Sequence, residues 1–469
     1  MQQPVRSGRA DAKAVAGVLD DLSGILGDRV SCSGAVRKQH GRDESWHAPA
    51  PPDAVVFPET VEEISSVVRA GARGRVPVIP FGAGTSLEGH VTAVCGGICI
   101  DMTRMNRVVR VSAEDMDCTV EAGITRKALN AHLRDTGLFM PVDPGADATL
   151  GGMVSTRASG TNAVRYGTIR ENVLGLTAVL ADGRIVHTGG RARKSAAGYD
   201  LTHLLTGAEG TLGVIAEVTL RLHGIPEETA AAVCAFASVD DAVRTVIETV
   251  QSGVPVARME LLDDAMVAAC NAYSGLALPE QPMLFLEFHG SRAAVAEQSE
   301  HVASIAMTNS GAGFEWSTRP EERTRLWEAR HNAYYAALAL APGKKGFTTD
   351  VCVPVSRLAE VIVRTRIDLD GTRLAAPLVG HVGDGNFHLI LLVDPDDSDE
   401  IAEAEAFHDR LIARALEAGG TCTGEHGIGT GKRRFLALEH GDALHAMRAI
   451  KAALDPLGLM NPGKLLPDS

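Results

Sequence analysis

A glycine-rich loop that follows a short apolar stretch constrains the fold of this chain more than any other feature. It runs over residues 80–89 with the sequence PFGAGTSLEG. Without side chains, Gly82 and Gly84 would let backbone N–H groups approach a phosphate closely. The loop is not a Rossmann dinucleotide fingerprint, because Leu87 stands where that motif needs its third glycine. We therefore expect an anion-binding loop of another kind.

A second loop repeats the same chemistry about 65 residues later. Residues 148–155 read ATLGGMVS, and residues 157–160 extend them with RASG. Both loops carry hydroxyl side chains, such as Thr85 and Ser86 in the first, that could add hydrogen bonds to a phosphate. Two such loops would suit one pyrophosphate gripped from both sides. Tight turns beside buried strands are the structural alternative, and the loops alone do not decide between the two.

Two histidines flank a Gly-Asp-Gly stretch in the second half of the chain, in residues 380–388 (GHVGDGNFH). A two-residue turn at residues 384–385 would set His381 opposite His388, with Cβ atoms about 4.5–5.5 Å apart. One bent strand carrying both imidazoles on one face is the alternative. Either arrangement predicts a pair of metal ligands.

A Glu-His pair follows at Glu425 and His426, inside a loop of sequence GEHGIGTGK. This loop is not a phosphate-binding P-loop, because His426 replaces its first glycine and Arg433 stands where Ser or Thr is required. Imidazole and carboxylate groups together suit Zn²⁺, Mn²⁺ or Fe²⁺. A flexible loop without ligands is the structural alternative.

Composition and charge exclude several classes of function. The net charge of −14 and an aromatic content of 4% argue against nucleic-acid binding. Eight cysteines without a C-x-x-C pair predict reduced thiols. The sequence shows neither the apolar core of a signal peptide nor a membrane-spanning run. We expect a cytoplasmic protein, with peripheral attachment to the inner membrane as a variant, and a homodimer is compatible with the sequence.

The loops at residues 80–89, 141–160, 162–167 and 207–215 resemble the flavin domain of vanillyl-alcohol-oxidase-type flavoproteins. Within that group the chain is most similar to FAD-dependent D-lactate dehydrogenases, with glycolate-oxidase flavin subunits and D-2-hydroxyglutarate dehydrogenases as siblings. The resemblance implies an α+β protein that binds FAD. Carried over by position, the FAD site would contain Pro80, Gly82, Ala83, Gly84, Thr85, Ser86, Pro144, Thr149, Gly151, Gly152, Ser155, Gly160, Glu209, Gly213 and Ile215. The first loop holds no His or Cys for a covalent flavin link, so we expect non-covalent FAD.

The patterns along the chain predict four parts, and the resemblance implies the type of the second one. Residues 1–50 would form an N-terminal helical segment and residues 51–225 a two-part FAD-binding domain of the vanillyl-alcohol-oxidase (PCMH) type. Residues 226–455 would form an α+β substrate or cap domain with an antiparallel sheet, and residues 456–469 a tail returning to the FAD domain. The Pro-Glu-Glu sequence that begins at Pro226 marks the main border.

The resemblance also assigns a metal site and a base. In D-2-hydroxyacid dehydrogenases the corresponding two histidines and glutamate bind a divalent metal, which maps to His381, His388 and Glu425, with zinc or manganese as the expected ion. His426 matches the residue proposed as general base, and a neutral imidazole suits proton abstraction near pH 7.

Substrate contacts are implied at four further positions. Arg330 would clamp the substrate carboxylate through its planar guanidinium, and Tyr334, one turn later on the same predicted helix, could touch the same ligand. Asn386 matches a substrate-contacting position. Thr348 lies where hydroxyglutarate dehydrogenases carry a lysine nearby for a second carboxylate, so we expect a monocarboxylate substrate.

The resemblance implies oxidation of a D-2-hydroxy acid, with D-lactate to pyruvate as the first expectation, by hydride transfer to flavin N5 with His426 as the base. A cytochrome, a quinone or an electron-transfer flavoprotein would accept the electrons. A glycolate-oxidase flavin subunit and a D-2-hydroxyglutarate dehydrogenase are the alternatives within the family. A metal-dependent hydrolase using His381, His388 and Glu425 is the alternative from another class.

Overall fold

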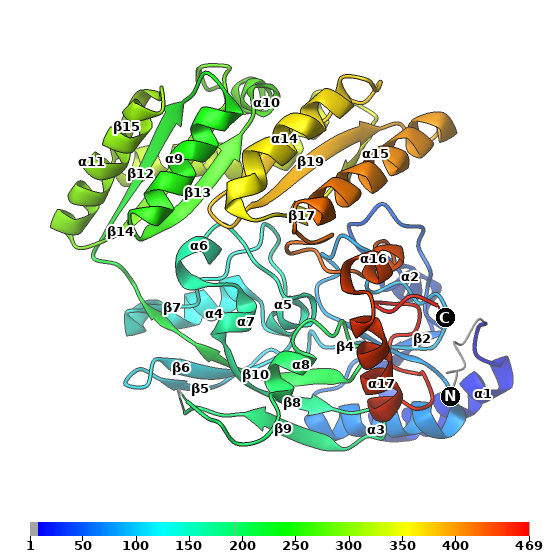
Figure 1. Ribbon diagram of the computed structural model, residues 1–469. Helices are drawn as coiled ribbons and strands as arrows, with labels where there is room; N and C mark the ends of the chain where they lie inside the picture. Colours follow the sequence, from blue (N-terminus) through cyan, green and yellow to red (C-terminus); the bar gives the residue numbers. More distant parts are fainter. Residues whose placement is uncertain (1–7, 193, 469) are drawn as a thin grey trace. The chain divides into compact units, whose positions relative to one another are not determined.

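The chain forms two compact units in a computed structural model that describes residues 8–192 and 194–468 (Figure 1). Unit 1 comprises the described residues up to Ser159, together with Thr168–Ile225 and the described residues from Glu425 onward. Unit 2 comprises Gly160–Gly167 and Pro226–Gly424. The polypeptide therefore passes between the units four times, because each unit is assembled from separated stretches of sequence.

The borders of the units differ in two places from the domain borders expected from the sequence. The border at Pro226 falls where the Pro-Glu-Glu sequence placed it. Residues 160–167, however, belong to unit 2, and unit 2 ends at Gly424 instead of near residue 455. The returning segment joins unit 1 through backbone pairing, in which Val78 N donates to Leu459 O at 2.9 Å.

Unit 1 contains a four-stranded sheet of order β1-β2-β4-β3, a five-stranded antiparallel sheet of order β5-β6-β10-β8-β9, and the short pair β11-β7. Its strands are β1 (Val30–Ser31), β2 (Ala54–Val56), β3 (Val78–Phe81), β4 (Ile98–Asp101), β5 (Val108–Ser112), β6 (Asp117–Glu121), β7 (Leu138–Phe139), β8 (Val173–Val179), β9 (Ile185–Gly189), β10 (Val214–Arg221) and β11 (His223–Gly224). Its helices are α1 (Ala12–Leu26), α2 (Gly34–Gln39), α3 (Val61–Gly74), α4 (Arg126–Leu133), α5 (Leu150–Thr156), α7 (Ile169–Asn172), α8 (Leu201–Leu205), α16 (Leu436–His440) and α17 (Ala443–Leu454), with 3-10 turns η1 (Gly27–Arg29), η2 (Arg134–Thr136) and η3 (Arg433–Phe435).

A parallel crossover leads the chain into the first glycine-rich loop. Strands β2 and β3 both pair in parallel with β4, and α3 connects them. Thr60 is the N-cap of helix α3, and its Oγ1 accepts a hydrogen bond from Glu63 N at 3.2 Å, as is typical of a threonine at this position. The loop then starts at the carboxyl end of β3, where it is supported by a buried strand.

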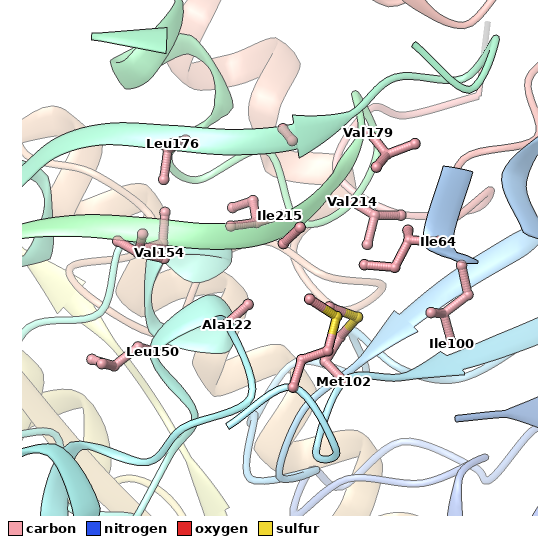
Figure 2. Close-up of a cluster of buried hydrophobic side chains, with 14 of the residues drawn as sticks. Ile64, Ile100, Met102, Ala122, Leu150, Val154, Leu176, Val179, Val214 and Ile215 are labelled. Atoms are coloured by element: carbon pink, nitrogen blue, oxygen red, sulfur yellow. The ribbon is translucent and has the colours of Figure 1, made fainter. Parts of the chain in front are cut away.

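The core of unit 1 lies between the two larger sheets and the helices that cover them. Figure 2 shows Ile64 of α3, Ile100 of β4, Val154 of α5 and Val214 of β10 within one cluster of buried apolar side chains. The second glycine-rich loop is anchored in this core, because Leu150 and Val154 of α5 are both fully buried. The sequence predicted a loop over residues 148–155; a short helix, α5, forms there because Thr149 caps it and its apolar residues are buried.

Unit 2 is built on one antiparallel sheet of eight strands, ordered β15-β12-β14-β13-β18-β19-β16, with β17 also paired to β19. The strands are β12 (Glu228–Ala235), β13 (Val256–Leu262), β14 (Met283–Gly290), β15 (Ala312–Ser317), β16 (Lys345–Thr348), β17 (Val351–Cys352), β18 (Leu378–His381) and β19 (Asn386–Val393). The helices are α6 (Ala163–Tyr166), α9 (Val239–Gln251), α10 (Asp264–Ser274), α11 (Arg292–Thr308), α12 (Pro320–His331), α13 (Ala333–Ala339), α14 (Val355–Leu369) and α15 (Ser398–Glu417).

The helices of unit 2 cover both faces of its sheet. Helices α9, α11, α14 and α15 lie side by side along one face (Figure 1). Helices α10, α12 and α13 pack on the other face, where they share a buried cluster with Phe285, Leu262 and Ile390. His388 lies two residues before Ile390 on β19, so its side chain belongs to this second face.

The turn between β18 and β19 differs from the two-residue hairpin expected from the sequence. His381 is paired with Asn386, and Val379 is paired with His388. The connection therefore has four residues, 382–385, and is closed by a hydrogen bond from Asp384 N to His381 O at 3.1 Å. The histidines are not directly opposite each other; they are diagonal neighbours on one face, because the register is shifted by two residues.

Among the described residues, no helix has both the length and the apolar character needed to cross a membrane.

We predict that Leu389→Ala lowers the free energy of unfolding of unit 2 by about 2–5 kcal/mol, because Leu389 is fully buried at the centre of β19. Ile367→Ala on α14 is the matched control, since Ile367 is exposed, and should change stability by less than about 0.5 kcal/mol. Urea unfolding followed by circular dichroism measures both. Equal shifts in the two variants would contradict this core.

Candidate functional site

The two glycine-rich loops of unit 1 meet directly. A Cβ atom added to Gly82 would lie 2.2 Å from Thr149 Oγ1. That hydroxyl is fixed in place, because it accepts a hydrogen bond from Gly152 N at 3.3 Å as the N-cap of α5. The loop at residues 80–89 and the start of α5 therefore approach one another as closely as a glycine allows.

A third stretch, around Glu209, joins these loops. Glu209 N donates to Ser155 O at 2.9 Å, at the end of the second loop. A Cβ added to Gly210 would lie 2.8 Å from Pro80 Cγ, at the start of the first loop. Three of the sequence stretches predicted to line the flavin thus converge within unit 1.

The remaining residues predicted for the FAD site have varied environments. Ile215 belongs to the hydrophobic core of unit 1 and is labelled in Figure 2. Ser86 Oγ donates to Asp43 Oδ2 at 2.9 Å, and Ser155 Oγ donates to Gly151 O at 2.7 Å. Gly160 lies in unit 2. Half-buried residues of the set are Gly82, Gly84, Thr85, Ser86, Pro144, Gly152 and Ser155; Ala83 is exposed.

The carboxylate of Glu209 holds the loop that begins with Glu425 and His426. Its Oε1 accepts a hydrogen bond from Ile428 N at 2.7 Å, and its Oε2 accepts one from Gly429 N at 2.8 Å. His90 Nε2 lies 3.3 Å from Oε1. Burial alone would lower the pKa of His90, but the charge and hydrogen bond of Glu209, together with the charges of Asp43 and Glu88, outweigh burial and raise it. The backbone two residues beyond His426 is therefore fixed within unit 1.

Unit 2 brings His381 and His388 together. Their ring centroids are 5.5 Å apart in an edge-to-face arrangement, and a nitrogen of each ring lies within 4.8 Å of a nitrogen of the other. His388 Nδ1 makes a 3.0 Å hydrogen bond to the carbonyl oxygen of Thr349, and His381 Nδ1 makes a 2.7 Å hydrogen bond to Glu260 Oε1. A neutral imidazole that donates from Nδ1 carries its lone pair on Nε2, as metal-binding histidines do.

Glu260 is a residue of this site that the sequence analysis missed. It is fully buried on β13, directly across the sheet from His381. Burial alone would raise the pKa of its carboxyl group, but His381 and Arg330 outweigh burial and hold that pKa below its usual value. A signal was present in the sequence, since Arg258 and Glu260 are two charges on one face of an otherwise apolar strand.

A second buried carboxylate, Asp350, ties several segments to the histidine pair. Asp350 Oδ1 accepts a hydrogen bond from Asn386 Nδ2 at 2.7 Å and lies 3.8 Å from His388 Nδ1. Its Oδ2 accepts one from Gly424 N at 2.9 Å. A Cβ at Gly424 would lie 2.1 Å from Asn386 Nδ2. Chain connectivity then places the Cα of Glu425 about 3.8 Å from that of Gly424.

The predicted carboxylate clamp, Arg330, lies at the end of α12 and is bound to Glu260. Its Nε donates to Glu260 Oε2 at 2.9 Å, and its Nη2 donates to the same oxygen. The helix ends at His331, and Tyr334 belongs to the next helix, α13. Arg330 and Tyr334 were expected on one face of a single helix. That expectation is wrong, because the helix is interrupted at Asn332.

Two further predicted residues border the same part of the sheet. Thr348 ends β16 and pairs with Ile390 of β19. Tyr334 packs over the same strand, since a Cβ added to Gly346 would lie 3.0 Å from Tyr334 Cε2. Both positions are compatible with the substrate contacts implied for them.

The donor chemistry of the two units fits the groups that the resemblance implies. In unit 1, glycines stand where side chains are excluded by neighbouring loops, which is the form of a nucleotide-phosphate cradle. In unit 2, two imidazoles have Nδ1 hydrogen-bonded to oxygen acceptors, which is the usual support of a metal-binding histidine.

Comparisons with known proteins show which domain families the two halves of the chain match. Residues 52–189 match the family described as FAD binding domain, and residues 225–465 match the family described as FAD linked oxidases, C-terminal domain. A probable mitochondrial D-lactate dehydrogenase from Danio rerio is 54% identical over 97% of this chain and 93% of its own length. A mitochondrial D-lactate dehydrogenase [cytochrome] from Arabidopsis thaliana is 47% identical over 96% of this chain and 80% of its own length.

A crystal structure of p-cresol methylhydroxylase with substrate bound has the same fold. Its TM-score is 0.82 at 16% sequence identity, with 98% of both chains covered. The expected α+β fold, with an FAD-binding domain of the PCMH type and a second domain built on an antiparallel sheet, is thereby confirmed. The expectation of a cytoplasmic location is wrong, because both D-lactate dehydrogenase relatives are named as mitochondrial.

We predict that Gly82→Ala is purified with little or no FAD, because its methyl group would collide with the fixed Thr149 hydroxyl where the two loops meet. Gly17→Ala is the matched control, since nothing lies within 4 Å of a Cβ at Gly17, and Gly17 lies on α1, outside the loops predicted to bind the flavin. The ratio of flavin to protein absorbance of each purified protein measures the effect. Full flavin content in Gly82→Ala would contradict the assignment of these loops to the cofactor.

Proposed function

The chain belongs to the family of FAD-linked oxidases that includes the D-lactate dehydrogenases, and on this premise we propose that it oxidises a small D-2-hydroxy acid, D-lactate first, to the 2-oxo acid. The observation that carries the proposal is the cluster of His381, His388, Glu260 and Arg330 on one face of the unit 2 sheet. Such a cluster offers metal ligands and a carboxylate clamp side by side. A hydrolase does not fit a chain of this family.

Arg330, Asn386, Tyr334 and Thr348 are the residues we assign to substrate binding. Glu260 occupies Nε and Nη2 of Arg330, so the Nη1 side of the guanidinium is the edge that would bind a substrate carboxylate. Asn386 is fixed by Asp350 at 2.7 Å, which orients its amide. These contacts orient the substrate so that only one face of its C2 atom can react.

His381, His388 and Glu425 would hold a divalent metal, zinc or manganese. The two histidines are supported by hydrogen bonds at Nδ1, and Glu425 follows Gly424, which is held by Asp350. When bound, the metal supplies a Lewis acid that lowers the pKa of the substrate hydroxyl group.

His426 is the residue we assign as base. An imidazole nitrogen of His426 accepts the proton of the substrate hydroxyl, and the hydrogen bonds from Ile428 N and Gly429 N to Glu209 hold its loop for that task. His426 Nε2 lies 3.9 Å from Glu425 Oε1, so the proposed base lies beside a proposed metal ligand.

FAD would be held without a covalent bond, because residues 80–89 contain neither His nor Cys and the neighbouring His90 lies against Glu209. When bound, FAD supplies the two-electron acceptor, with N5 as the atom that takes the hydride from C2 of the substrate. We propose a cytochrome as the electron acceptor, which the name of the Arabidopsis relative supports.

A monocarboxylate fits better than a dicarboxylate. Lys344, just before β16, forms an ion pair with Glu400 and donates to Leu392 O, so its charge is already compensated. The names of both relatives point to the same small substrate.

Anaerobic bleaching of the flavin by D-acids is the experiment that tests this function. D-Lactate should bleach the flavin at 450 nm faster than D-2-hydroxyglutarate or glycolate, and L-lactate should leave it oxidised. A protein that binds FAD but is reduced by none of these acids would instead be a non-catalytic flavin subunit.

We predict that His426→Gln slows flavin reduction by D-lactate about 10²–10⁴-fold while FAD content stays unchanged, because glutamine cannot accept the proton. His445→Gln in the same unit is the control, since His445 is exposed on α17. Stopped-flow absorbance measures both rates. A near-normal rate in His426→Gln would remove this residue as the base.

We predict that His388→Ala, stripped with a chelator and then reconstituted with Zn²⁺ or Mn²⁺, retains far less metal than the wild-type protein. The exposed His301 on α11 provides the matched control, His301→Ala, which should load fully. Elemental analysis of the dialysed proteins gives metal per chain. Equal loading of the two variants would place the metal elsewhere.

A further inference from the structure

Two buried clusters of the same composition lie on one face of the unit 2 sheet. In one, Glu260 lies between His381 and Arg330. In the other, Glu287 lies between His289, at 2.8 Å, and Arg258, at 3.5 Å. The first cluster contains a proposed metal ligand and a proposed substrate clamp, and the second contains neither. Because the two clusters have the same composition, comparing variants of their glutamates distinguishes a structural role of such a cluster from a functional one.

We propose that Glu260 is the positioning residue that sets the geometry between the metal site and the substrate carboxylate clamp. The inference rests on the proposed function and adds a residue to it. Each oxygen of Glu260 serves one side: Oε1 accepts from His381 Nδ1 at 2.7 Å, and Oε2 accepts from Arg330 Nε at 2.9 Å. One rigid carboxylate thus fixes the distance between His381 and Arg330. The hydroxyl and carboxylate oxygens of a bound substrate must match that distance.

Burial makes this bridge rigid. Glu260 has no exposed surface, and its backbone is held in the sheet between β14 and β18. His381 lies directly across from it, so the imidazole reaches the carboxylate without a change in the strands. Arg330 is also largely buried, with a side-chain exposure of 11%. An arginine on a helix end would otherwise sample many rotamers, and the carboxylate selects one of them.

Charge is the second contribution of Glu260. A divalent cation bound by His381 and the guanidinium of Arg330 are both positive, and the Glu260 carboxylate contacts both His381 and Arg330. The negative carboxylate between them lowers that repulsion, which is strong in a buried site. Its hydrogen bond also fixes the imidazole tautomer and raises the basicity of Nε2. Loss of Glu260 should therefore weaken metal binding and substrate binding together.

Glu260→Gln is the decisive variant, because glutamine keeps the volume but loses the charge and turns one acceptor into a donor. That donor would face an N–H group of His381 or of Arg330. We expect the Kd for Zn²⁺ or Mn²⁺ to rise about 10–100-fold, and we expect KM for D-lactate to rise by at least as much as kcat falls. Glu260→Asp should recover only part of this loss, because its shorter side chain cannot span both partners.

Glu287→Gln is the matched control, since it removes the same charge from an equivalent His–Glu–Arg cluster of the same sheet. Its metal Kd and its KM for D-lactate should stay within about threefold of the wild-type values. Urea unfolding of both Gln variants tests whether they lose stability to a similar degree. Calorimetric titration of Zn²⁺ or Mn²⁺ into metal-stripped, FAD-loaded protein gives the Kd values, with His381→Ala as the reference for a lost ligand.

The possible results of these titrations distinguish a failure of the positioning role from a failure of the proposed function on which it rests. Weak metal binding in His381→Ala and Glu260→Gln, but not in Glu287→Gln, supports the positioning role. Weak binding in His381→Ala with normal binding in Glu260→Gln overturns the positioning role and leaves the metal site standing. Equal losses in Glu260→Gln and Glu287→Gln overturn it as well, because the effect would then be general destabilisation. A wild-type protein that binds neither ion overturns the metal site and this inference together.

Discussion

The register of three neighbouring antiparallel strands is the constraint on which the proposed chemistry depends. Pairing of β13 with β18 sets Glu260 across from His381, and pairing of β18 with β19 brings His388 to the same face. A shift of one residue would turn His388 toward the opposite face of the sheet. Because side chains of these strands are packed against helices on both faces, such a shift would exchange residues between the two faces and disrupt the packing of both, so side-chain packing holds the histidines in place.

Close approach between loops plays the corresponding part in unit 1. Gly82 leaves no room for a side chain beside Thr149, and Glu209 links the second loop to the segment that carries Glu425 and His426. Elements predicted to bind the flavin and the loop predicted to carry the base are thus held by one buried carboxylate. Each unit therefore uses a glutamate to fix groups that come from distant parts of the sequence.

Much of the fold and part of the site could be predicted from local patterns. The start of α3 follows from the capping sequence at Thr60, and the glycine-rich loop after β3 is visible as spacing alone. The turn between β18 and β19 was predicted two residues too short, because a Gly-Asp-Gly stretch is compatible with several turn types. Helix α5 was missed because its glycines and hydroxyl residues disfavour a helix until burial stabilises it.

The sequence by itself determined the family, the loops predicted to bind FAD and the candidate ligands His381, His388 and Glu425, because these depend on residue types at fixed spacings along the chain. Only the tertiary structure decided which groups support them. Glu260 is 121 residues from His381, and Glu209 is 219 residues from Ile428. No local pattern relates residues so far apart. Strand pairing and loop packing bring them into hydrogen-bond distance, and because both glutamates are buried, their carboxylates bond to these residues and not to water.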